Sequence, residues 1–212
     1  MQPRQLNDQT LGAQQWLDSQ NAGSVLCVSV GDFESEQMAE LGFGLEGLER
    51  PFLWINNSKV EILEEFRERV RDRGFVISGD SAPPGTVFLP HPSIGGFMTR
   101  GGWNSILASI ATGVPIITWP VEGDHFSNSV LVAEVLKVGV EICRGYQGFP
   151  HRDKLKRAVE QIMGGGGGQA ERVRELGDSA RKSVSEGGFS TQSIEAFVDE
   201  IHKLSSAPEL SA

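Results

Sequence analysis

The chain has 212 residues, 39% hydrophobic and 22% charged, a composition typical of a globular protein with one sizeable core. Its formal net charge of −9 argues against nucleic acid as a partner, because a nucleic-acid binder needs a basic surface. Neither Cys27 nor Cys143 belongs to a CxxC pair, so we expect a buried, reduced thiol at Cys27 and no metal site. The absence of a signal-peptide pattern and of a membrane-length apolar run predicts a cytoplasmic protein without a membrane partner.

Short apolar runs alternate with amphipathic segments over the first two thirds of the chain. The runs are continuously apolar, which favours a parallel sheet that is covered on both faces. Their alternation with helices predicts a doubly wound, Rossmann-like α/β fold. Strands are predicted at 24–30, 51–55, 74–78, 94–99, 114–119 and 138–142, and helices at 34–48, 60–71, 104–111 and 126–136.

The two ends of the chain differ in amino-acid composition from this central part. The first residues are polar, with Trp16 and Leu17 as the only strong anchors, and they resemble a linker that enters the domain from a preceding one. Near the end, five consecutive glycines at 164–168 predict a flexible surface loop. We therefore divide the chain into an inter-domain linker remnant (1–20), the α/β domain (21–148), C-terminal helices that pack on it (149–204, with helices at 153–163, 169–185 and 191–204) and a disordered tail (205–212).

The strand predicted at 94–99 runs into two glycines and a helix. Ligands of open α/β sheets bind at the carboxyl ends of the strands, and a helix N-terminus there attracts anions. Arg100 is the only lysine or arginine between Ala82 and His125, and Asn104 and Ser105 fall in the first helical turn. A diphosphate site and a plain tight turn with a helix cap both fit this pattern.

The next strand is followed by Asp124 and His125. A carboxylate can accept hydrogen bonds from two neighbouring sugar hydroxyls. Alternatively, Asp124 is the N-cap of the helix that begins near Phe126. The pattern leaves both interpretations open.

The segment GTVFLPHPSIGGFMTRGGWNSILASIATGVPIITWPVEGDHFSN resembles the plant secondary product glycosyltransferase box, which marks the donor-binding domain of UDP-sugar-dependent glycosyltransferases. The first predicted strand, the helix and strand after it, and the tail from R-x-R to GGFST are also similar, so that the resemblance covers Trp16 to Leu204. The shared residues of the box are His91-Pro92, Gly95-Gly96-Phe97, Thr99, Gly102-Trp103-Asn104-Ser105, Gly113-Val114-Pro115, Trp119-Pro120 and Asp124.

The resemblance implies the C-terminal half of a two-domain GT-B enzyme that transfers a hexose from a UDP-sugar to a hydroxyl of a small molecule. Family members are inverting and metal-independent, and need no cofactor beyond the donor. Their catalytic base and acceptor pocket belong to an N-terminal domain, so no catalytic residue is expected in this chain, and His91 is expected to pack a loop. The implied donor-binding residues are Gly31, Pro83, Gly85, Arg100, Gly102, Trp103, Asn104, Ser105, Asp124 and His125.

The chain departs from the family pattern at several donor-contacting positions. Arg100 replaces a histidine and strengthens phosphate attraction, whereas the missing aromatic platform forfeits roughly 1–3 kcal/mol of stacking. The missing ribose carboxylate removes a further bond of roughly 1.5–3 kcal/mol. The replacements are Ala82 for Trp, Gly85 for Gln, Arg100 for His, Ala108 for Glu, His125 for Gln, and Asp32 for Ser or Thr.

Two functions are therefore consistent with the sequence. One is the donor-binding half of a UDP-glycosyltransferase. The other is a catalytically inactive, truncated or degenerate half that keeps the fold and binds a nucleotide or a partner weakly. A dehydrogenase is disfavoured, because no G-x-G-x-x-G follows the first strand.

Overall fold

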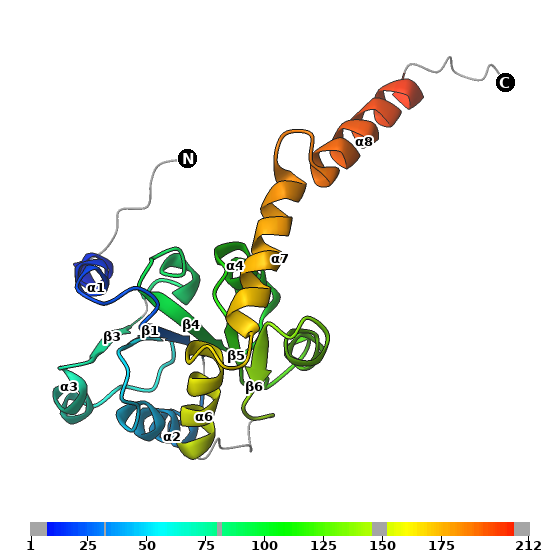
Figure 1. Cartoon of the computed structure of the whole chain (residues 1–212). Coiled ribbons are helices and arrows are strands. Elements are labelled where there is room, and N and C mark those ends of the chain that lie inside the picture. Colours follow the sequence, from blue (N-terminus) through cyan, green and yellow to red (C-terminus); the bar gives the residue numbers. More distant parts are fainter. Residues whose placement is uncertain (1–7, 32, 80–81, 146–151, 206–212) are drawn as a thin grey trace.

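The computed structural model describes residues 8–31, 33–79, 82–145 and 152–205. Its centre is one parallel sheet of six strands in the order β3-β2-β1-β4-β5-β6, with helices on both faces (Figure 1). The predicted doubly wound, Rossmann-like fold is thereby confirmed. The strands are β1 (Val25–Ser29), β2 (Phe52–Asn56), β3 (Gly74–Ser78), β4 (Ile94–Thr99), β5 (Ile116–Thr118) and β6 (Gly139–Glu141).

Apolar residues alternate between the two faces along β1 to β5, so that each of these strands contributes to a core on both faces of the sheet. The helices are α1 (Asp8–Asp18), α2 (Ser35–Glu46), α3 (Glu64–Val70), α4 (Trp103–Thr112), α5 (His125–Val130), α6 (Arg152–Met163), α7 (Gln169–Val184) and α8 (Phe189–Ser205). On one face of the sheet, Leu26, Trp54 and Met98 belong to a cluster with α2, α3 and α6. On the other face, Cys27, Leu53 and Phe97 pack with α1, while α4 and α7 cover Ile116.

The observed elements differ from the predicted ones at three short segments. The helix expected from Val60 begins only at Glu64, and Val60 and Ile62 reach the core from the preceding loop. The helix expected at 126–136 consists of α5 and a π-helical turn, η2 (Leu131–Val135). A 3₁₀ turn, η1 (Gly85–Val87), precedes β4.

Helix α1 is the first larger difference from the prediction. It lies in the segment that was expected to be a linker, and it was not predicted as a helix. Ala13 and Leu17 are fully buried against the sheet, and α1 contacts β3. Trp16, one of the two expected anchors, packs against Phe75 of β3 with ring centroids 5.8 Å apart. These residues therefore form part of the domain core rather than a tether.

The second departure is α8, which we expected to pack on the domain with α6 and α7. α6 contacts α2 and the sheet, and α7 contacts α4, but among the described residues α8 has no buried residue and projects away from the sheet (Figure 1). Its apolar side chains are exposed instead: Phe189, Ile194, Phe197, Val198, Ile201 and Leu204. The predicted tail at 205–212 falls, after Ser205, outside the described residues.

Candidate functional site

The strand order reverses between β1 and β4, and a crevice at such a switch point is where open α/β sheets bind ligands. β1 and β4 are paired from Val25 with Ile94 to Ser29 with Thr99, so their carboxyl ends lie side by side. The loops that follow begin with Val30 and Gly31 on one side and with Arg100 on the other. The sequence-predicted residues around Arg100 are therefore at the edge where a ligand is expected.

Arg100 extends across this switch point and lies directly over Gly31. Gly31 has a φ of +70°, and a Cβ built on it would lie 2.9 Å from Nη2 and 3.1 Å from Cζ of Arg100. The backbone conformation therefore favours glycine there, and the absence of a side chain leaves room for the guanidinium above it. The Arg100 side chain is 26% exposed, so it is partly desolvated yet open to a ligand.

The N-terminus of α4 adjoins Arg100. Gly102 is the N-cap residue of α4, and because it has no side chain, it makes no side-chain cap to the first turn. Its carbonyl accepts hydrogen bonds from the N–H groups of Ser105 (3.0 Å) and Ile106 (3.2 Å). The N–H groups of Trp103 and Asn104 precede these first bonds of the helix. Both side chains are exposed, while Ser105 is half-buried. The positive end of the helix dipole therefore points to the same edge as Arg100.

The start of α5 closes the other side of this site. Asn128 donates from Nδ2 to the carbonyl of Gly101 (3.0 Å) and to Oδ2 of Asp124 (2.8 Å). Asp124 is the N-cap residue of α5, as one of the two interpretations held, but its side chain makes no cap bond and accepts from Asn128 instead. Exposed Asp124 keeps its other carboxylate oxygen available to a sugar hydroxyl.

His125 lies against the glycine turn. A Cβ built on Gly102 would be 3.8 Å from its Nε2, and one built on Gly101 would be 3.5 Å from its carbonyl oxygen. Its buried Nδ1 has no hydrogen-bond partner among the described residues. The ring is thus held beside the first turn of α4, where Nε2 can reach a ligand at the helix N-terminus.

A polar network beneath α5, which the sequence did not reveal, fixes this arrangement. Ser129 donates to Glu141 (2.7 Å) and pairs with the hydroxyl of Thr118 (2.5 Å), and Arg144 donates twice to the Glu141 carboxylate. Partial burial tends to raise the pKa of Glu141, but the hydrogen bonds from Arg144 and Ser129 outweigh it and the pKa is lowered. Arg144 also lies over the ring of Phe126, 5.7 Å from its centroid.

The positions expected to contact the base lie before β4. A Cβ on buried Gly85 would be 2.6 Å from Cβ of Ser29, so this glycine serves close packing at the end of β1 and presents no surface to a ligand. Half-buried Ala82 packs at the edge of a core cluster, and its carbonyl accepts from Nδ2 of Asn57 (3.0 Å). Pro83 is half-buried beside it, and Asp32 lies outside the described residues.

The departure at Ala108 concerns the ribose. Ala108 is half-buried on α4 and packs at the edge of the same core cluster as Ala82. It offers no polar atom in its side chain. The carboxylate that family members place here therefore has no substitute at this position.

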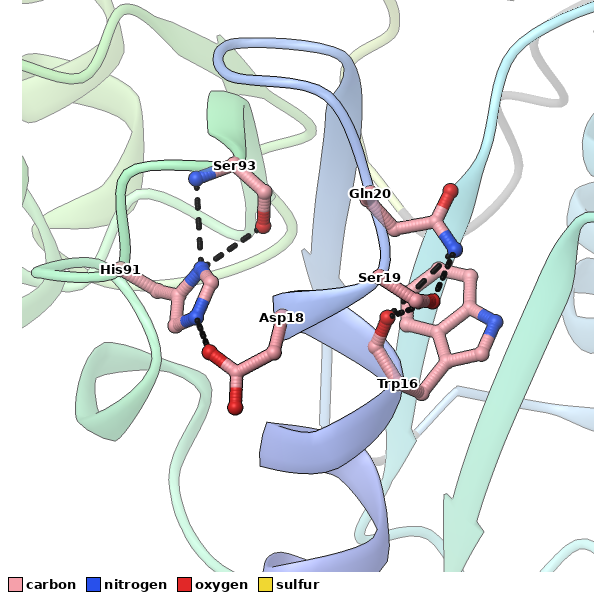
Figure 2. Close-up of polar contacts among 6 residues, drawn as sticks. All are labelled: Trp16, Asp18, Ser19, Gln20, His91 and Ser93. Carbon is pink, nitrogen blue, oxygen red and sulfur yellow. Dashed lines mark hydrogen bonds and ion pairs between the residues drawn. The ribbon is translucent and has the colours of Figure 1, made fainter.

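His91 lies at the opposite, amino-terminal edge of the sheet and ties the loop before β4 to α1 (Figure 2). Its Nδ1 accepts from the N–H of Ser93 (3.2 Å) and pairs with the Ser93 hydroxyl (2.8 Å), so Nε2 carries the proton and donates to Asp18 (3.1 Å). Every polar contact of this ring is internal. His91 is thus a packing residue of the loop rather than part of the ligand edge.

Metal sites and membrane-spanning helices are both absent from the part of the chain that the structure describes. Among the described residues, no three histidine, cysteine, aspartate or glutamate side chains gather in a group that could hold a metal ion. Within the same part of the chain, no helix has both the length and the apolar character needed to cross a membrane.

Sequence comparison relates this chain to plant glycosyltransferases. Residues 11–164 match the family described as UDP-glucoronosyl and UDP-glucosyl transferase. UDP-glycosyltransferase 73C11 of Barbarea vulgaris is 42% identical over 89% of this chain, and UDP-glycosyltransferase 73C5 of Arabidopsis thaliana is 41% identical over 89%. The chain spans about 43% of the length of each of these relatives.

Solved structures show the same relationship. UGT2 of Phytolacca americana, complexed with UDP-2-fluoro-glucose and pterostilbene, superposes with a TM-score of 0.80 at 37% identity, covering 89% of this chain and 44% of that one. A UDP-glucosyltransferase from Polygonum tinctorium, complexed with 3,4-dichloroaniline, has a TM-score of 0.80 at 34% identity over 88% of this chain and 43% of its own. Because the family matches residues 11–164, this chain belongs to the UDP-glycosyltransferase family, and it spans a little less than half the length of the relatives named above.

Proposed function

We propose that this chain is the donor-binding half of a UDP-dependent glycosyltransferase, with the donor diphosphate at the β1–β4 switch point. The observation that carries the proposal is the position of Arg100, over Gly31 and beside the N-terminus of α4. A guanidinium and a helix N-terminus at the same edge of the sheet both attract an anion such as a diphosphate.

In the proposed reaction the acceptor oxygen attacks the anomeric carbon, its proton passes to a base, and the bond between the sugar and UDP breaks. UDP leaves with the bonding electron pair, so negative charge grows on its β-phosphate. Arg100 and the N–H groups of Trp103 and Asn104 are placed to stabilise that charge. Asp124 and His125 would orient the sugar hydroxyls, while the base and the acceptor pocket come from a part that this chain does not contain.

We propose further that transfer needs no metal, since Arg100 and the backbone N–H groups just described would stabilise the charge on the diphosphate that Mg²⁺ stabilises in other enzymes. We also propose a cytoplasmic setting, which the two free cysteines, Cys27 and Cys143, favour. Burial raises the pKa of the Cys27 thiol, so this thiol stays protonated and inert.

A second candidate, a degenerate half that binds a nucleotide only weakly, is favoured by a specific observation. Ala82 and Ala108 both pack on the core and present neither an aromatic platform nor a carboxylate to a nucleoside. Such a protein would retain phosphate attraction and lose most recognition of the base and ribose.

Calorimetric titration with UDP and with UDP-glucose distinguishes these candidates. The proposed function predicts micromolar binding of both ligands, unchanged by EDTA and lost in Arg100→Ala. Arg71→Ala is the matched control, because Arg71 is an exposed arginine (79%) at the end of α3 and should be replaceable without effect. Binding of UDP that is no tighter than millimolar, or absent, would contradict the proposed function and favour the degenerate half.

A further inference from the structure

Glu122 is an acidic side chain at the proposed anion site. It lies in the loop between β5 and α5, and its Oε1 is 3.5 Å from Nη1 of Arg100. The carboxylate is 57% exposed, and Gly123, with a φ of +52°, follows it in the loop. An anionic group thus lies where the ligand's negative charge has to arrive.

Arg100 has neighbours on two sides. The guanidinium lies against the backbone at Gly31 and forms an ion pair with the carboxylate of Glu122. The other acidic side chain of this loop, Asp124, is engaged by Asn128. Because Arg100 is the only lysine or arginine between Ala82 and His125, an incoming phosphate and Glu122 compete for one cation within this segment.

We infer that Glu122 is an internal competitor of the ligand phosphate, and that it sets the affinity of this site for anionic nucleotides. The inference rests on the proposed function, because it assumes that the diphosphate binds Arg100. Since Glu122 is more than half exposed, the ligand can displace it into solvent, and the site then changes from an internal ion pair to a guanidinium–phosphate pair.

The size of the effect follows from the exposure of the pair. Exposed ion pairs are weak, so release of Arg100 by Glu122→Gln should tighten UDP binding by roughly three- to tenfold. The gain should shrink as ionic strength rises, because salt screens both the ion pair and the repulsion of the ligand. Uridine has no phosphate, and its binding should not change.

The test is a calorimetric comparison of UDP and uridine, at low and at physiological salt, on four proteins: wild type, Glu122→Gln, Arg100→Ala and the double variant. Glu195→Gln, on α8 and far from the sheet, removes the same charge and is the matched control (Figure 1). We expect Glu122→Gln to bind UDP more tightly, Glu195→Gln to match wild type, and the double variant to behave like Arg100→Ala.

The outcomes separate this inference from the function on which it rests. Loss of UDP binding in Arg100→Ala, with unchanged affinity in Glu122→Gln, would overturn the inference and leave the proposed function intact. The same gain from Glu122→Gln with and without Arg100 would also overturn it, because the carboxylate would then act without the guanidinium. No UDP binding in any of the proteins, Glu122→Gln included, would refute both.

Discussion

Replacing Gly31 by alanine should separate a stability effect from a binding effect. An L-residue in the left-handed region costs about 1–2 kcal/mol, and Gly31 has a φ of +70°. The added Cβ would meet Nη2 of Arg100 at 2.9 Å, but this atom is the end of a flexible side chain and can move away. We therefore expect a stability loss of about 1–2 kcal/mol from the backbone alone, and a displaced guanidinium.

Gly23→Ala provides the control, because Gly23 has a φ of +66° and no atom within 4 Å of its built Cβ. Urea unfolding should give similar losses for the two variants, whereas calorimetry should show weakened UDP binding only for Gly31→Ala. Equal UDP affinities in the two variants would show that the position of Arg100 over Gly31 has no role in the site.

Three further predictions concern the support of the site and the distal helix. Ser129→Ala should lower the free energy of unfolding in urea by about 1.5–3 kcal/mol, because it removes a buried donor to the Glu141 carboxylate. The control, Ser127→Ala, changes an exposed serine of the same helix and should cost less than about 0.5 kcal/mol. Equal losses in the two variants would show that the bond from Ser129 to Glu141 does not stabilise the fold. Because the pKa of Glu141 is lowered in the folded protein, the stability that its carboxylate contributes is present above pH 4.5, its ordinary pKa. This stability is lost as the pH falls through the lowered pKa. Glu141→Gln should therefore flatten the acid limb of the stability–pH profile, and an unchanged limb would refute this. Deleting residues 187–212 should change the unfolding free energy by less than about 0.5 kcal/mol, since no residue of α8 is buried; a larger loss in urea would show that α8 supports the core.

Much of the fold could be predicted because its strands are short, apolar and separated by clear turn residues. β3 and β4 coincide with the predicted 74–78 and 94–99. α1 was missed because it buries only Thr10, Ala13 and Leu17, a narrow stripe in an otherwise polar segment. α8 presents the opposite problem, since its apolar spacing is that of a packed helix and only the tertiary structure shows that the stripe is uncovered.

The parts of the site that depend on backbone conformation and on the sequence motif could be predicted. The contacts between long side chains and distant residues could not. The glycine turn before α4 and the position of Arg100 followed from the sequence. The contact of Arg100 with Glu122, the bond from Asn128 to Gly101 and the bond from Ser129 to Glu141 join residues that are 12 to 27 positions apart. No local pattern identifies such partners.

The most direct test of the central claim is an amide chemical-shift map of the chain during titration with UDP. The account predicts that the signals of Gly102, Trp103 and Asn104 shift first and saturate together, and that these shifts disappear in Arg100→Ala. Shifts confined to another part of the chain, or shifts around α4 that persist without Arg100, would contradict a diphosphate site at the β1–β4 switch point.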